Sequence, residues 1–115
     1  MSSASISENS GEILAAAETH GRVFFVRLDP KTGKVSPPVS PETKAKHPVA
    51  IGNRRGEVLL AWTEGTAWAK GGSVAWQLYD KEGKPISEKG RADGLPPWSL
   101  PTALAEPDGN FTIIY

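Results

Sequence analysis

The chain has no cysteine, and among its 115 residues there are only one methionine and two histidines. Without cysteine it can form no disulfide and offers no thiolate, which leaves its redox compartment open. A zinc site needs three or four converging ligands, and His20 and His47 stand at different places in the repeat described below. The sequence therefore predicts no metal site and no cofactor.

Long apolar runs and an excess of one charge are also lacking. No run approaches the roughly 20 apolar residues of a membrane-spanning helix, so no membrane span is predicted. The 13 basic and 13 acidic residues are dispersed, whereas a nucleic-acid-binding protein usually carries a basic stripe. The one local basic cluster is interpreted as a solvated loop; it consists of Lys44, Lys46, Arg54 and Arg55. No nucleic-acid partner is predicted.

The first ten residues are polar and contain no hydrophobic signal-peptide core. The protein is therefore expected either to be cytoplasmic or to be secreted from a longer precursor. The sequence does not decide its localisation.

Helical periodicity is absent as well, because no window of helical length keeps an i, i+3, i+4 apolar pattern. Short runs of Val, Ile, Trp, Phe and Tyr are present instead, separated by Gly, Pro, Asn and Asp. Such runs are typical of strands and turns. The alanines of residues 12–17 favour helix, but this segment aligns with an apolar run at 57–62. The predicted fold class is all-β and antiparallel.

One strand pattern recurs three times along the chain. Its copies read GEILAAAE, GEVLLAWT and GNFTIIY and begin at Gly11, Gly56 and Gly109. Pro48 and Pro101 each lie eight residues before their glycine, and the run at 22–29 matches that at 73–80. Self-similarity at spacings of 45 and 53 residues indicates a repeat architecture.

Each unit is predicted to contain four short strands. In the second unit these are expected at residues 48–51, 57–63, 73–80 and about 85–89. Four-stranded units of about 40–50 residues are typical of β-propeller blades. The chain is thus predicted to be a single repeat domain of two complete blades and a half blade, with units at about 3–47, about 48–100 and 101–115.

The units resemble those of the sialidase-like (BNR-type) β-propeller superfamily, most clearly in AWT at 61–63 and KGGSVAWQ at 70–77. The resemblance covers nearly the whole chain and implies the C-terminal blades of such a propeller. The family's Asp-box, Ser-x-Asp-x-Gly-x-x-Trp, is incomplete, because residues 80–84 keep only its Asp-x-x-Gly core. In sialidases proper the resemblance implies an arginine triad, a Tyr/Glu nucleophile pair and an acid/base Asp, and none of these matches a position here.

A propeller ring needs four to eight blades, more than this chain supplies. Three explanations stay open: a C-terminal piece of a longer propeller, a ring built from several chains, or an open stack of blades. The apolar strand at 111–115 leaves a bare edge, which invites pairing. The expected partner is a second copy or a set of missing N-terminal blades.

One insertion has no counterpart in the first unit, the Gly-rich segment at residues 65–72. Loops on rigid scaffolds often carry function, and sugar rings stack on indole faces. A ligand site, with a glycan as the possible ligand, is predicted there, with Trp68 as the stacking platform and Glu64 and Lys70 as the polar rim. The alternative is that Trp68 folds back over a neighbouring blade.

The other tryptophans are given structural roles. Trp62 and Trp76 lie within predicted strands and are expected to pack between blades. Trp98 is expected to anchor the crossing from one blade to the next.

Carboxylate pairs are considered because glycoside hydrolysis usually uses two of them. The candidates are Glu18, Asp29, Glu64, Asp80 and Asp93. Glu18 and Glu64 both follow the second strand of their units and are interpreted as hairpin-end charges, so no catalytic residue is assigned. The predicted function is a non-catalytic binding or scaffold module that assembles into a ring by oligomerisation. Two alternatives are a C-terminal fragment of a sialidase-like glycoside hydrolase and a purely structural self-assembling repeat.

Overall fold

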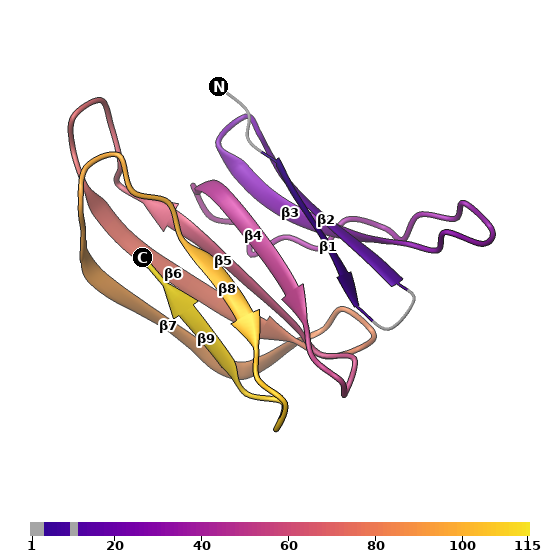
Figure 1. The fold of residues 1–115 in the computed structure, drawn as a ribbon. Helices are drawn as coiled ribbons and strands as arrows, with labels where there is room; N and C mark the ends of the chain where they lie inside the picture. The colour runs from indigo at the N-terminus through magenta and orange to yellow at the C-terminus, as the bar shows by residue number, and fades with distance from the viewer. Residues whose placement is uncertain (1–3, 10–11) are drawn as a thin grey trace.

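The computed structural model describes residues 4–9 and 12–115, and within these ranges the regular elements are all β-strands. The strands form three antiparallel sheets, and in each sheet consecutive strands pair with each other (Figure 1). In chain order they are β1 (Ala4–Asn9), β2 (Glu12–Thr19), β3 (Arg22–Leu28), β4 (Lys46–Gly52), β5 (Val58–Glu64), β6 (Gly72–Tyr79), β7 (Pro85–Leu95), β8 (Thr102–Ala105) and β9 (Phe111–Ile114). The all-β, antiparallel prediction is confirmed.

The first sheet consists of β1, β2 and β3 in that order. The turn between β2 and β3 is His20-Gly21, and both residues have positive φ, as a two-residue type I′ hairpin requires. The alanines of β2 pair with Phe24, Phe25 and Val26 of β3. This pairing overrides their helical propensity, because a half-buried pleated surface favours a strand partner.

The fourth strand predicted for the first unit is irregular in the described structure. The segment after β3 meets it only at isolated bridges, which are Leu28 with Val35, Phe25 with Val39, and Arg22 with Lys44. The segment contains Pro37, Pro38 and Pro41, which lack the N–H that a continuous ladder needs. The first unit is therefore three regular strands with a proline-rich edge, not four regular strands as predicted.

The second sheet has the order β4, β5, β6, β7, and its strands lie where the sequence predicts them. β5 is its centre, with every residue except the last buried. β7 runs to Leu95, further than expected. β4 contains an irregularity between Lys46 and Val49, where His47 has a φ of 53° just before Pro48. The third sheet is the pair β8 and β9.

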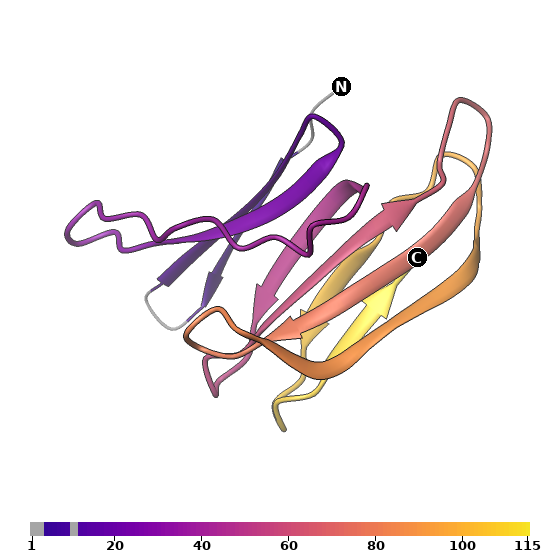
Figure 2. The ribbon, with the colours of Figure 1, turned by 180° about the vertical axis from the view of Figure 1, so that it is seen from behind.

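The second sheet lies between the other two (Figures 1 and 2). We call the face that each sheet turns toward the next sheet in the chain its forward face, and the opposite one its backward face. The forward face of the first sheet and the backward face of the second share one buried cluster, made of Leu14, Ala16, Val23, Phe25, Ala45, Ala50, Val58, Leu60, Trp62, Ala75 and Tyr79. The rings of Phe25 and Tyr79 meet edge to face across it, with centroids 5.4 Å apart.

Polar contacts link the turns of neighbouring sheets. Arg27 on β3 donates to the carbonyl oxygens of Gly56 and Asp80 in the second sheet, at 3.2 and 3.3 Å. Asn53 in the β4–β5 turn donates to the carbonyl oxygen of Gly109 in the third sheet at 2.8 Å. Two of the three repeated glycines thus accept a hydrogen bond from the preceding sheet. The third, Gly11, lies outside the described residues, as does Ser3, where the first predicted unit begins.

Candidate functional site

Trp68 stands at the tip of the β5–β6 hairpin and is 86% exposed. Ala67 and Lys70 pair across the tip, where the Lys70 N–H donates to the Ala67 carbonyl at 2.9 Å. The base of the hairpin is close-packed, because a Cβ on Gly71 would collide with the Leu95 carbonyl. A closely packed base therefore carries an exposed indole. Of the two readings of Trp68, exposed platform or ring folded back over a blade, its exposure fits the first.

Trp98 provides a second exposed indole beside the first. Its turn is closed by the Ser99 N–H donating to the Pro96 carbonyl at 3.2 Å. Proline at the second position and a positive φ, here 66° at Trp98, at the third are the pattern of a type II turn, where glycine is usual. Trp98 was predicted to anchor the crossing from one blade to the next. Its ring is 71% exposed, so burial of the ring does not provide such an anchor. Its ring meets that of Trp68 edge to face, with centroids 5.9 Å apart at 90°.

The two indoles form part of a cleft of about 400 Å³ between the hairpin tip, the start of β4 and the β7–β8 crossing. Its lining is Lys46, His47, Thr66, Ala67, Trp68, Lys70, Trp98, Ser99 and Leu100. This lining includes two lysines and a histidine, and no carboxylate among the described residues. Within the described ranges neither Lys46 nor Lys70 has an ion-pair partner. We call this site the tryptophan cleft.

Glu64, predicted as part of the same rim, belongs to a different group of side chains. One of its oxygens accepts from the Trp62 indole N–H at 2.8 Å, and the other accepts from Arg91 at 2.8 Å. Arg91 also contacts Ser73 and Asp93. Glu64 thus fixes the ring of Trp62 and the edge strand β7, and it does not line the tryptophan cleft. The structure brings Trp68 and Lys70 together and places Glu64 elsewhere.

The remaining carboxylate candidates have structural partners or stand alone. Asp80 accepts from the backbone N–H groups of Lys84 and Glu82, chiefly the former, and these bonds hold the pKa of its carboxyl below the usual value. Asp29 accepts from the Lys31 N–H in the matching turn. The Asp-x-x-Gly remnant at residues 80–83 is therefore a turn-closing device. The hydroxyl of Ser73, and then Arg91, lowers the pKa of Asp93.

Glu18 is buried at the end of β2, rather than exposed as the interpretation of a hairpin-end charge implies. Glu18 lines neither the tryptophan cleft nor the cleft of about 660 Å³ between the second and third sheets. Glycoside hydrolysis usually needs two carboxylates in one substrate-sized space. None of the five candidates lines the latter cleft, whose lining includes Glu57 and Glu88 instead.

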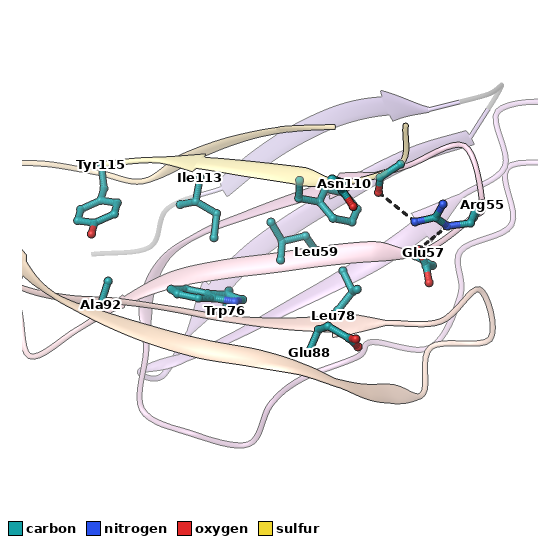
Figure 3. A pocket seen from close by; sticks show the side chains of 12 residues that line it. Arg55, Glu57, Leu59, Trp76, Leu78, Glu88, Ala92, Asn110, Ile113 and Tyr115 are labelled. Atoms are coloured by element: carbon teal, nitrogen blue, oxygen red, sulfur yellow. Dashed lines mark hydrogen bonds and ion pairs between the residues drawn. The ribbon is translucent and has the colours of Figure 1, made fainter. Parts of the chain in front are cut away.

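A second cleft, of about 660 Å³, separates the forward face of the second sheet from the third sheet. Figure 3 shows Trp76 and Leu78 of β6 beneath Ile113 of β9, with Arg55 and Glu57 at one end. The Asn53 amide, followed by Arg55, holds the pKa of Glu57 below its usual value. Trp76 lies over Gly90, where a Cβ would collide with the indole. Both tryptophans were predicted to pack between blades. Trp62 lies in the buried cluster between the first two sheets, whereas Trp76 lines the cleft between the second and third sheets.

Trp98, Lys46 and His47 are among the members of the tryptophan cleft that the sequence did not predict. The available signal was a tryptophan directly after two prolines in a polar crossing, where burial is difficult. The two other residues come from the start of β4, and only the fold brings them near the hairpin tip.

Within the described residues there is no group of three or more His, Cys, Asp or Glu side chains placed to hold a metal. The described chain also has no helix with the length and hydropathy for crossing a bilayer. Comparison with protein-family models, with curated proteins and with solved structures finds no match. The resemblance to sialidase-like propellers therefore stays a prediction based on this chain's own residues.

Proposed function

We propose that this chain is a non-catalytic, β-propeller-type carbohydrate-binding module whose ligand occupies the tryptophan cleft. The observation that carries the proposal is the pair of exposed indoles of Trp68 and Trp98, in edge-to-face contact at 5.9 Å. Large exposed aromatic rings on a soluble surface usually mark an interaction site. Two indoles at right angles offer one flat face for stacking and one wall beside it.

Sugar chemistry fits this combination. A pyranose ring has an apolar face of C–H groups and a rim of hydroxyls, so it needs a flat aromatic surface with hydrogen-bond donors around it. Lys46 and Lys70 supply ammonium donors at this rim, and Ser99 supplies a hydroxyl. The positive charge of the lining favours a saccharide that carries a carboxylate or sulfate.

Backbone strain at the cleft supports a functional role. Within the described residues, five residues other than glycine have positive φ, and three of them are His47, Ala69 and Trp98. Such conformations cost about 1–3 kcal/mol each and persist mainly where the surrounding structure imposes them, often at binding sites. Their clustering around one cleft is what a site shaped for a ligand would produce.

The propeller-type architecture rests on the three antiparallel sheets stacked face to face. In this proposal the three stacked sheets form a scaffold, and other chains complete the propeller ring. The tryptophan cleft lies at the ends of the strands of this scaffold. A binding role is favoured over hydrolysis because the described lining of the cleft contains no carboxylate.

The test is a glycan array followed by calorimetric titration with the best ligand. Trp68→Ala and Trp98→Ala are each expected to weaken binding by at least about tenfold, because each removes an aromatic surface worth roughly 1.4 kcal/mol or more. Tyr115→Ala is the matched control, since it removes an exposed aromatic ring away from the cleft and should leave affinity unchanged. An array without any ligand, or affinity that survives both tryptophan substitutions, would contradict the proposal.

A further inference from the structure

The chain uses one kind of contact twice. The forward face of the first sheet, with Leu14 and Phe25, packs on the backward face of the second, with Leu60 and Tyr79. The forward face of the second sheet then faces the backward face of the third sheet across the cleft of Figure 3. In both contacts a forward face meets a backward face.

The repeat explains why the direction is constant. Leu14 and Ala16 of β2 correspond to Leu59 and Ala61 of β5 when the repeated glycines are aligned. Because side chains alternate along a strand, the matching residues occupy the matching face of each sheet. The same alignment places Thr112 and Ile114 of β9 on the forward face of the third sheet.

Among the described residues, nothing covers the backward face of the first sheet or the forward face of the third sheet. The backward face of the first sheet includes Ile6, 78% exposed, beside Ala15 and Val26, which pair with each other. Strand alternation places Glu8 and Arg22 on the same face, toward its two ends. On the outer side of this face lies Val35, 59% exposed. One end of the stack therefore presents a backward face with no forward face against it.

The other end of the stack presents an open forward face, that of the third sheet. The forward face of the third sheet is formed by two cross-strand pairs, Thr102 with Ile114 and Leu104 with Thr112. Ile114 is 51% exposed and Leu104 is 39% exposed. Neither β8 nor β9 contains a charged residue. The Glu106 carboxylate, in the turn after β8, reaches the face and accepts from the Thr112 hydroxyl at 2.8 Å.

We propose that a second copy of this chain docks head to tail, with the forward face of one third sheet on the backward face of the next copy's first sheet. This contact continues the two sheet-on-sheet contacts already inside the chain. It is heterologous, so repeating it produces a ring if the rotation closes and a helical stack if it does not. It rests on the stacked-sheet part of the proposed function and not on the tryptophan cleft.

Two single substitutions at exposed positions separate the faces. Ile6→Glu charges only the backward face and Ile114→Glu only the forward face, and each is expected to weaken self-association by at least about 100-fold because the contact would bury an unpaired carboxylate. One chain has a mass of 12.3 kDa. Sedimentation equilibrium at about 100 µM, a working concentration for weak interfaces, should give an average mass above this value for the wild type. Each variant alone should give the mass of one chain. Circular dichroism checks that both variants fold.

Mixing Ile6→Glu with Ile114→Glu tests whether the contact joins a forward face to a backward face. Each retains the face that the other has lost, so an equimolar mixture should form a complex of two chains and nothing larger. Leu100→Glu, an exposed leucine on neither face, is the matched control and should associate like the wild type.

A single-chain mass for the wild type would overturn the head-to-tail contact. A variant that still dimerises alone would also overturn it, since that result indicates an isologous contact, and so would a mixture that stays monomeric. Titrating the best glycan into the folded, monomeric variants keeps the two proposals apart, because the tryptophan cleft is intact in both.

Discussion

Tyr79 shows how strongly the contact between the first two sheets excludes water. Its ring packs against Phe25 in the buried cluster, and this burial raises the pKa of its hydroxyl to about 12. Ionising the hydroxyl would place a phenolate in an apolar environment, so the folded state holds the proton more tightly than the unfolded chain does.

The raised pKa predicts a loss of stability in alkali. The contribution is fully present below pH 10, the value for an exposed tyrosine, and is lost as the pH rises toward about 12. The free energy of unfolding should fall by about 1–3 kcal/mol across this range. Urea denaturation at a series of pH values should show that Tyr79→Phe removes this dependence, whereas Tyr115→Phe at an exposed position keeps it. An unchanged alkaline slope in Tyr79→Phe would show that the hydroxyl is not desolvated.

Individual residues were also where the sequence was least informative. Trp68 was predicted as an exposed platform because the hairpin insertion has no counterpart in the first unit. Glu64 is adjacent in sequence to the same loop, but its side chain bonds to Trp62, two residues earlier on β5, and to Arg91 on β7. The second of these bonds depends on strand pairing, which no local pattern encodes. A residue's neighbours in the chain do not determine the face that its side chain occupies.

At the scale of elements, the β5–β6 hairpin combines a rigid base with a strained tip. Gly71 and Gly72 allow the backbone to approach Leu95 and Glu64 closely. Ala69 at the tip has a φ of 55°, which is unfavourable for a residue with a Cβ. The geometry holds Trp68 outward, and the strain is local to one residue.

Relieving that strain should stabilise the protein. Ala69→Gly is expected to raise the free energy of unfolding by about 1 kcal/mol, because glycine adopts positive φ without steric cost. Ala67→Gly is the matched control in the same hairpin; its φ is not positive, so it should give no gain and lose up to about 1 kcal/mol. Chemical denaturation measures both, and equal losses in the two variants would show that Ala69 is unstrained.

Elements were predicted more successfully than side chains. Alternating apolar runs and Gly-containing turns placed the strands of the second sheet to within a few residues, because period and turn chemistry are local properties. The fourth strand of the first unit failed where Pro37, Pro38 and Pro41 remove ladder donors, a signal that was visible in the sequence. The length of β7 depends on pairing with β6, which no local pattern encodes.

At the scale of the whole molecule, the two proposed interaction regions are separate. The tryptophan cleft lies at the ends of strands. The open backward and forward faces belong to the first and third sheets, which are the two outer sheets of the stack (Figures 1 and 2). Sugar binding should therefore not require association of chains. The repeat suggested that the units stack. The meeting of Trp68 with Trp98 is a tertiary property that no sequence pattern indicated.

The most direct test of the central claim is to follow the four tryptophan indole N–H signals by NMR while the best array glycan is added. The account predicts saturable shifts for Trp68 and Trp98, with Trp62 and Trp76 unchanged, because those two rings pack at sheet faces away from the cleft. Signals are assigned by single tryptophan substitutions. Shifts confined to Trp62 or Trp76, or no saturable shift at either cleft tryptophan, would contradict the claim that this chain binds sugar through the tryptophan cleft.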